Sequence, residues 1–124
     1  MFEKRITVNV RAADELGRHR IVRQLRALPG VGVVRGDEDA AVDILVMGRH
    51  DQDGPDELRR LARAGRAPLV LVAQELGETE LMAVAEYGVR SVLRADRLTP
   101  GRLSRAVHQA AGCCPRVPIE AALV

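Results

Sequence analysis

The side chains of this 124-residue chain that could bind a small molecule are mainly arginines. Arg11, Arg49 and Arg94 each stand beside the end of an apolar run with β-strand character, and Gln74 follows another such run. Guanidinium groups hold carboxylates and phosphates through paired hydrogen bonds, so these residues could bind an anionic metabolite if the runs end at one edge of a sheet. The alternative is that they are solvated surface arginines in an arginine-rich chain, in which Lys4 is the sole lysine.

The sequence offers little else for catalysis. The apolar run VDILVM, at 42–47, ends at Gly48, which has no nucleophile. The segment VRAADELG after the first run is not a glycine-rich phosphate loop, and no Ser, His and Asp set falls at the strand ends. Cys113 and Cys114 are adjacent and are expected to be free thiols in a reducing cytosol. We therefore predict that the protein is not an enzyme and has neither a cofactor nor a metal site.

Charge and composition limit the classes of partner that this domain is expected to bind. The formal net charge is only +2, and aromatic residues make up 2% of the chain. Single-stranded nucleic acid is held by aromatic stacking and duplexes by excess positive charge, so no direct nucleic-acid contact is expected from this domain. No apolar run of about 20 residues exists, and the N-terminus reads directly into a strand without the h-region of a signal peptide. A cytoplasmic protein without membrane contact is the expectation.

Strand and helix signals alternate along the chain. Runs rich in Val, Leu and Ile predict strands over 5–10, 31–34, 42–47, 68–73 and 89–95. Amphipathic spacing between and after these runs predicts helices over 14–28, 54–65, 78–88 and 99–111. This alternation is typical of a doubly wound, five-stranded parallel sheet of the flavodoxin-like α/β class, in which ligands collect at the carboxyl ends of the strands.

Several of these segments resemble a known family. GVRSVLRAD at 88–96, TPGRLSRAV at 99–107 and the spacing of Arg18, Ile21 and Leu25 are similar to the receiver domain of bacterial response regulators, particularly receivers that precede a helix-turn-helix output domain. The resemblance implies a receiver-like domain over 1–111. Residues 112–124 would then be a tail or linker, at the place where the family continues into a DNA-binding domain. The sequence does not separate a natural single-domain regulator from an N-terminal piece of a transcription factor.

The resemblance also implies that the phosphorylation pocket is degenerate. In a working receiver an aspartate ending the third strand accepts the phosphoryl group, an acidic pair after the first strand binds Mg²⁺, and a hydroxyl and a lysine end the fourth and fifth strands. Here the acidic pair falls on Ala12 and Ala13, the acceptor on Gly48, the hydroxyl on Ala73 and the lysine on Ala95. The chain is therefore similar to an atypical receiver, or pseudo-receiver, that cannot be phosphorylated in the family's manner.

A slip in the alignment leaves an alternative open. Asp14 and Glu15 would then take the acidic role, and Asp43 or Asp51 the acceptor role. Asp43 opens the third strand, at the wrong end of the sheet, whereas Asp51 lies in the loop beyond that strand. Neither alignment provides a lysine at the fifth strand.

The connection between the second and third strands departs from the family. Receivers place a full helix there, but RGDEDAAV at 35–42 has eight residues, and a parallel crossover ordinarily takes about a dozen or more. We expect the helix to be shortened or absent, with either a single turn and shortened strands or a rearranged sheet edge. Its loss would leave apolar sheet surface partly uncovered, which would favour oligomerisation or a bound partner.

In the family, the face formed by the fourth helix, fifth strand and fifth helix usually mediates dimerisation. The residues of this chain that fall on that face carry both charge signs, as suits a two-fold interface: Glu86, Tyr87, Arg90, Asp96, Arg97, Arg105 and His108. The favoured interpretation is a non-enzymatic regulatory module, a phosphorylation-independent receiver-like domain of a transcriptional regulator that acts by forming a homodimer, by binding a ligand, or both. The alternative is a domain that binds or transforms an anionic metabolite on the same fold.

Overall fold

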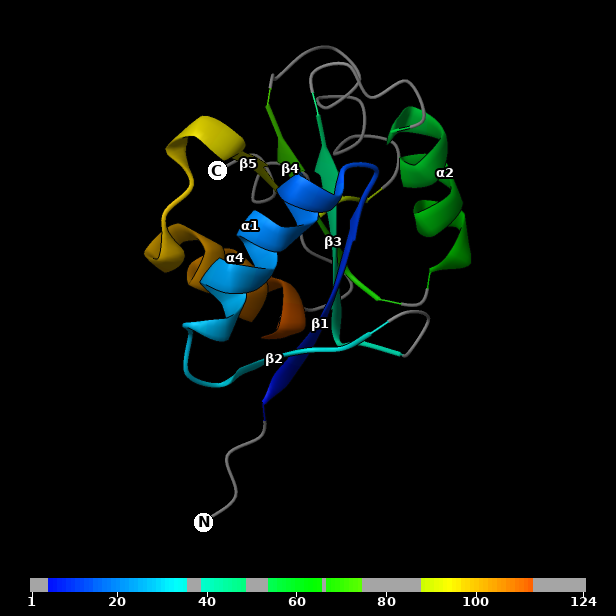
Figure 1. Cartoon of the computed structure of the whole chain (residues 1–124). Coiled ribbons are helices and arrows are strands. Elements are labelled where there is room, and N and C mark those ends of the chain that lie inside the picture. The colour runs from blue at the N-terminus through cyan, green and yellow to red at the C-terminus, as the bar shows by residue number, and fades with distance from the viewer. Residues whose placement is uncertain (1–4, 36–38, 49–53, 66, 75–87, 113–124) are drawn as a thin grey trace.

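The computed structural model describes residues 5–35, 39–48, 54–65, 67–74 and 88–112 (Figure 1). They contain a five-stranded sheet in the order β2-β1-β3-β4-β5, and every neighbouring pair of strands is parallel. The strands are β1 (Ile6–Ala12), β2 (Val31–Val33), β3 (Val42–Met47), β4 (Leu69–Ala73) and β5 (Ser91–Arg94). The doubly wound parallel sheet predicted from the sequence is confirmed, and all of its predicted strands are present.

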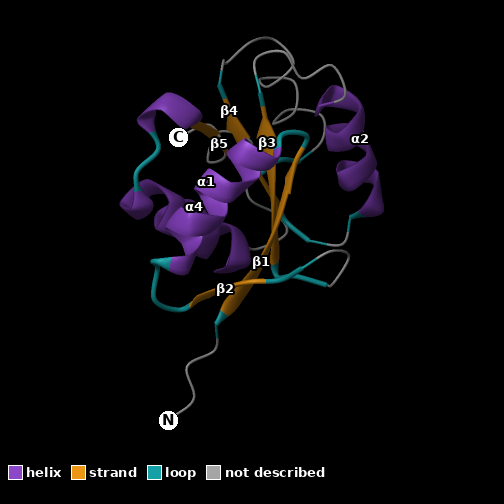
Figure 2. Ribbon diagram, viewed as in Figure 1, coloured by secondary structure: helices purple, strands orange, loops and turns teal. Residues whose placement is uncertain are grey.

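Helices lie on both faces of this sheet (Figure 2). The helices α1 (Glu15–Arg26) and α4 (Pro100–Gly112) pack on one face, and α2 (Gly54–Ala64) packs on the other. A single 3₁₀ turn, η1 (Ala95–Arg97), follows β5 and leads toward α4. The helix predicted over 78–88 lies outside the described residues.

Local signals set the ends of the helices. The Asp14 carboxylate accepts a hydrogen bond from the backbone N–H of Leu16, at 3.1 Å, and so caps α1. After α1, Gly30 has a φ of 80°, a left-handed conformation that glycine adopts more readily than other residues. The chain then turns into β2. The Thr99 hydroxyl accepts a hydrogen bond from the N–H of Arg102 at 3.1 Å and caps α4. The helix starts predicted at Asp14 and Thr99 are confirmed.

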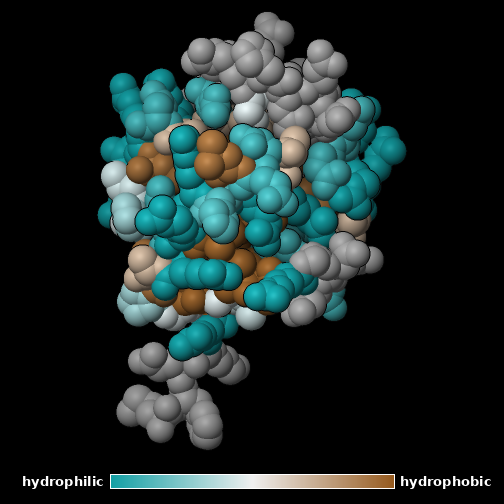
Figure 3. All heavy atoms as spheres, viewed as in Figure 1, coloured by the Kyte–Doolittle hydropathy of each residue, from teal (hydrophilic) through white to brown (hydrophobic). Residues whose placement is uncertain are grey.

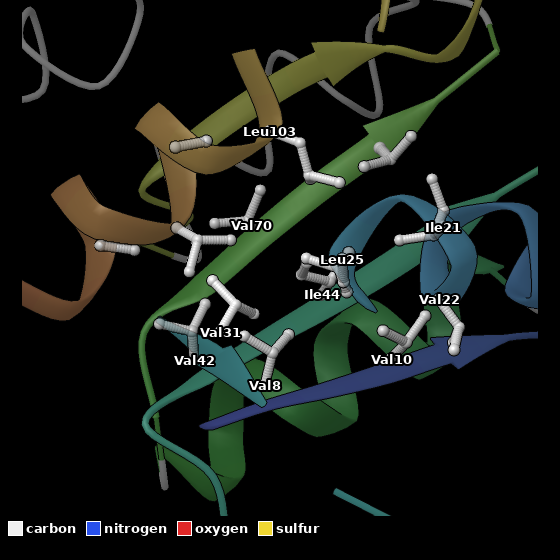
Figure 4. Close-up of a cluster of buried hydrophobic side chains, with 14 residues drawn as sticks. Val8, Val10, Ile21, Val22, Leu25, Val31, Val42, Ile44, Val70 and Leu103 are labelled. Atoms are coloured by element: carbon white, nitrogen blue, oxygen red, sulfur yellow. The ribbon is translucent and has the colours of Figure 1, made fainter. Parts of the chain in front are cut away.

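The main hydrophobic core fills the space between the sheet and the pair α1 and α4 (Figure 4). On α1, Ile21, Val22 and Leu25 turn inward, and Leu25 is fully buried. Their partners are aliphatic residues of the strands and of α4: Val8, Val10, Val31, Val42, Ile44, Val70, Val72, Leu103, Ala106, Val107 and Ala110. A smaller cluster, in which Leu58 and Leu61 meet β3 and β4, holds α2 against the opposite face. The burial of these aliphatic side chains is the main driving force for this fold.

The register on β1 explains how a short connection joins β2 to β3. Val33 at the end of β2 lies opposite Val8, and Val42 at the start of β3 lies opposite the same residue on the other side. The chain therefore leaves β2 and enters β3 at one level. Two strand spacings, about 10 Å, are all that it must cross, whereas residues 34–41 could span more than twice that distance at about 3.3 Å per residue.

Both ends of this connection are tied to β1. The N–H of Val34 donates to the Val8 carbonyl at 2.9 Å, and the N–H of Ala41 donates to the Thr7 carbonyl at 2.9 Å and lies 3.0 Å from its hydroxyl oxygen. The described residues of the connection, 34–35 and 39–41, contain no helical turn. β2 is short, with three residues, and the two ends of the connection meet β1 at the same residue, which fits the expected shortened or absent helix.

The sheet face that a crossover helix would cover here is polar. Because the valines of β1 turn toward α1 and α4, strand alternation turns Thr7, Asn9 and Arg11 to the α2 side. Asn9 is 3% exposed and pairs in register with Asp43 of β3. On β2 the residue on this side is Gly32. The expectation of uncovered apolar surface at this edge is therefore wrong, since these strands present polar side chains and glycine there.

A charged pair stands at the start of α2. Glu57 accepts hydrogen bonds from Nε of Arg60, at 3.0 Å, and from Nη2 of the same side chain. These bonds, with further help from the positive charges of Arg60 and Arg11, hold the pKa of Glu57 below its ordinary value despite partial burial. Strand alternation likewise places the Arg11 side chain, from β1, on the same side of the sheet as α2.

The packing of the core predicts that two leucines of α1 contribute very differently to the free energy of unfolding. Replacing the fully buried Leu25 by alanine is expected to lower the free energy of unfolding by about 2–5 kcal/mol, because it removes buried methyl groups and leaves a cavity. The matched control is Leu16→Ala on the same helix, where the side chain is 59% exposed and the change should stay within about 0.5 kcal/mol. Urea unfolding measures both, and equal losses would contradict the assignment of the buried face.

The Glu57 pair predicts a small, pH-dependent contribution to stability. Glu57→Gln should lower the free energy of unfolding by less than about 1 kcal/mol at pH 7, because the pair is partly solvated. A lowered folded-state pKa stabilises the fold above the unfolded-state pKa, and this stabilisation is lost as the pH falls through the folded-state value. Unfolding curves of the two proteins should differ at pH 7 and converge in acid. A difference that persisted unchanged below the folded-state pKa would rule out this origin.

Candidate functional site

The carboxyl edge of the sheet brings together the positions that the sequence singled out. Ala12, the last residue of β1, pairs with β3 one residue before that strand ends. Ala73, the last residue of β4, pairs with the last residues of β3 and β5. Ala13, Gly48 and Ala95 directly follow β1, β3 and β5. These residues therefore lie along a single edge, at the top of the sheet in Figure 1.

None of the side chains at these positions can donate, accept or coordinate. Ala73 is buried at 1% exposure, Ala12 is half-buried, and Ala13 and Gly48 are exposed. Ala95 packs partly against the main core. A Cβ built on Gly48 would have no described atom within 4 Å, so a Cβ there meets no clash among the described residues.

The acidic residues of the alternative alignment lie in different places. The Asp14 carboxylate is occupied as the cap of α1, and Glu15, the first residue of that helix, is exposed. Asp43 lies near the amino end of β3, where its N–H donates to the Pro68 carbonyl at 2.9 Å, which is the end of the sheet opposite to Gly48. Asp51 lies outside the described residues.

The arginines proposed for anion binding are only partly brought together. Arg94 donates two hydrogen bonds to the Asp96 carboxylate, at 3.2 and 2.9 Å, so an anion would compete with that carboxylate. Arg11 lies on the α2 side, where its charge acts on Glu57. Gln74 is exposed just past β4, with its N–H donating to the Met47 carbonyl at 3.3 Å. Arg49 lies outside the described residues, and the anion site stays a prediction.

The predicted dimer face is partly described. Asp96, Arg97, Arg105 and His108 are exposed on η1 and α4, whereas Arg90, just before β5, is half-buried. His108 Nδ1 lies 2.8 Å from the Ser104 carbonyl oxygen, which accepts a hydrogen bond when that nitrogen is protonated. Glu86 and Tyr87 fall outside the described residues. No partner chain is present, so the dimer face also stays a prediction.

The polar face of β1 was not predicted from the sequence. Thr7, Asn9 and Arg11 alternate with apolar residues in ITVNVRA, and this period of two was the signal that could have revealed a polar sheet face. Also not predicted was the role of Arg18, whose Nε donates to the Val10 carbonyl at 3.3 Å and ties α1 to β1.

Among the described residues, no three or more His, Cys, Asp and Glu side chains are grouped as metal ligands. None of the described helices combines the length and apolar character that crossing a membrane requires.

No family model matches the sequence, and no curated protein matches it. The fold, in contrast, is similar to solved structures. One is a protein from Burkholderia pseudomallei described as pilus assembly-related, with a TM-score of 0.72 and 20% identity over 94% of this chain and 96% of that chain. Another is the isolated receiver domain of RcsB from Salmonella enterica serovar Typhimurium, with a TM-score of 0.70 and 16% identity over 98% and 100%. A third is a CheY-like response regulator from Mesorhizobium loti, with a TM-score of 0.64 and 22% identity over 85% and 98%.

The similarity extends over whole domains. The matches cover nearly all of this chain and of the three solved chains, and the two response-regulator structures among them are receivers or receiver-like. At identities of 16–22% these matches establish the fold alone, and any chemistry must be argued from the residues of this chain. The chain has the flavodoxin-like fold of response-regulator receiver domains.

Proposed function

We propose that the chain is a non-enzymatic regulatory module, a receiver-like domain that works without phosphorylation and acts through dimerisation, ligand binding, or both. The observation that supports this proposal is that Ala12, Ala13, Gly48, Ala73 and Ala95, which the sequence resemblance aligns with a receiver's reactive residues, lie at the carboxyl edge of the sheet and have no reactive side chain. The fold is retained while every reactive side chain of the family's pocket is replaced by hydrogen or methyl.

Each replacement removes a separate requirement of phosphoryl transfer. Magnesium binds oxygen ligands, which Ala12 and Ala13 do not have, and transfer needs a nucleophile, which Gly48 does not have. Charge on the transferred group must be balanced by positive groups, and Ala95 provides none. A working pocket also crowds carboxylates together, which raises the energy of the folded state until a cation binds. The alanines and glycine remove that cost.

Without a covalent input, the module's output depends on association or on a ligand. A two-state domain responds only to a partner that binds one state better than the other, and a permanent homodimer is the simplest such partner. The exposed residues Asp96, Arg97, Arg105 and His108 carry the charges for a two-fold contact. RcsB is described as bound to a promoter, and by analogy we place this domain in a transcriptional regulator. A protein described as pilus assembly-related has a similar fold, so the fold alone does not indicate a transcriptional regulator.

The alternative, binding of an anionic metabolite beside Gly48, has weaker support. Its two described arginines lie next to carboxylates, Arg94 beside Asp96 and Arg11 near Glu57. A metabolite would therefore have to displace Asp96 before Arg94 could bind it.

The emptied pocket predicts no reaction with phosphodonors. Incubation with acetyl phosphate and magnesium should leave the intact mass unchanged, for the wild type and for Gly48→Asp. The variant should fold, because a Cβ there meets no clash among the described residues, but it still has no magnesium ligands and no lysine. A working receiver treated in parallel confirms that the phosphodonor is active. A one-phosphoryl gain in Gly48→Asp would show that Asp14 or Glu15 binds metal and would reject the alignment.

The dimer proposal is tested by sedimentation equilibrium at micromolar concentrations without a phosphodonor. We expect a homodimer, and Arg97→Glu should shift it toward monomer by at least tenfold in dissociation constant, because it places a like charge near the Asp96 carboxylate at the proposed contact. Arg63→Glu, an exposed arginine of α2 on the other face, is the matched control and should have no effect. A wild-type monomer across this range would leave ligand binding as the only route for the module.

A further inference from the structure

The helix layer on one face of the sheet is strongly basic. From Leu16 to Arg26 and from Arg97 to Gly112 the chain has seven arginines and no aspartate or glutamate. The first segment is nearly all of α1, and the second is the end of η1 with α4. These helices contact each other on the same sheet face, so the fold merges two distant basic segments into one surface.

Most of these arginines are available at the surface. Arg18 is tied to the Val10 carbonyl and is half-buried. The other six are exposed and form what we term the basic face: Arg20, Arg23, Arg26, Arg97, Arg102 and Arg105. Figure 3 shows hydrophilic side chains over α1, with apolar residues visible in patches between them.

The surface ion pairs among the described residues lie away from the basic face. Arg59 pairs with Asp56 and Arg60 with Glu57 on α2, and Arg94 pairs with Asp96. The guanidinium groups of the basic face have no carboxylate within ion-pair distance among the described residues. Among the described residues no ion pair offsets their charge, and the positive charges of two neighbouring helices add up.

We propose that the basic face binds the phosphate backbone of duplex DNA. Arginine is suited to phosphate, because its planar guanidinium donates paired hydrogen bonds and keeps its charge at every physiological pH. Contacts with the backbone need positive charge and no base-reading side chains, which is what the exposed positions of α1 and α4 provide. This inference rests on the distribution of charge and is independent of the proposed loss of phosphorylation.

Other anionic partners fit this surface less well. A membrane-surface helix needs a row of apolar residues to insert, and the single large apolar side chain of high exposure among the described residues is Leu16, at 59%. Single-stranded nucleic acid needs aromatic platforms, and the only aromatic residues, Phe2 and Tyr87, lie in neither helix.

The net charge of the whole chain does not reveal this basic face. A chain of charge +2 has no excess of positive charge as a whole, and this argued against nucleic-acid contact. Binding depends on the local field, however, and acidic residues on the opposite side of a domain are largely screened at physiological salt, where the Debye length is about 8 Å. The expectation of no direct nucleic-acid contact and the proposed surface make opposite predictions, which a binding measurement separates.

The test is fluorescence anisotropy of the full chain with a labelled duplex of random sequence. We expect non-specific binding with a dissociation constant in the micromolar range or weaker at physiological salt. With about five phosphate contacts, the logarithm of the binding constant should fall with the logarithm of salt at a slope of about −4.5, or about a hundredfold between 50 and 150 mM. No binding at 50 mM salt would overturn the proposal.

Matched variants separate the basic face from net charge. The double variant Arg20→Gln, Arg23→Gln should weaken binding at least tenfold at 50 mM salt and make the slope shallower by about 2. Arg59→Gln, Arg63→Gln removes the same charge from exposed positions of α2 and should change binding less than twofold. Circular dichroism confirms that both variants fold. Equal weakening by the two variants would show that only the overall charge matters and would overturn the assignment.

A further pair of measurements separates DNA from an acidic protein. Leu16→Ala should leave duplex binding unchanged, because backbone recognition does not use an apolar side chain. Poly-glutamate at equal charge concentration should compete with the duplex only weakly, since carboxylates on a flexible chain do not match the spacing of phosphates on a duplex. Strong competition, or a loss with Leu16→Ala as large as that with the arginine variant, would identify an acidic protein as the partner and reject DNA.

Discussion

The arrangement of the whole domain depends on the pairing of β1 with two strands at one residue. Val8 lies opposite the last residue of β2 on one side and the first residue of β3 on the other. This stagger makes a short connection sufficient where the fold ordinarily uses a helix, and it keeps β3 beside the carboxyl half of β1. The ends of β1, β3, β4 and β5 therefore meet at one edge, although the connection that usually positions β3 has been reduced to a short crossing.

Stability and chemistry are separable in this fold. The core is built from aliphatic side chains of the strands, α1 and α4, and none of its buried members at the carboxyl edge needs a polar partner. Under the proposed function, alanine and glycine in place of a receiver's reactive residues would leave this packing intact and remove the repulsion between crowded carboxylates. A domain of this kind keeps a surface for association after it has lost its reaction, which is the basis of the proposed regulatory role.

The two faces of the sheet differ in electrostatic character. On the α2 side, polar residues of β1 and the Glu57–Arg60 pair keep charges balanced near the sheet. On the α1 and α4 side, six exposed arginines form the basic face, and none of them is in an ion pair with a described carboxylate. Arg97 and Arg105 belong both to this face and to the proposed dimer contact. Dimerisation and binding of a polyanion would therefore influence one another, since both use the same guanidinium groups.

Much of the fold could be read from local patterns. Periods of two and 3.6 residues, the caps Asp14 and Thr99, and the order of elements specify which segments become strands and helices, because these properties depend on residues close together in the chain. That Ala12, Ala13, Gly48, Ala73 and Ala95 lie at the carboxyl edge followed from their places at or after the end of each predicted strand. The stagger at Val8, the pairing of Arg94 with Asp96 and the union of two arginine segments into one surface could not be predicted in this way. They arise from contacts across strands and helices, and such contacts depend on how distant segments are brought together in space.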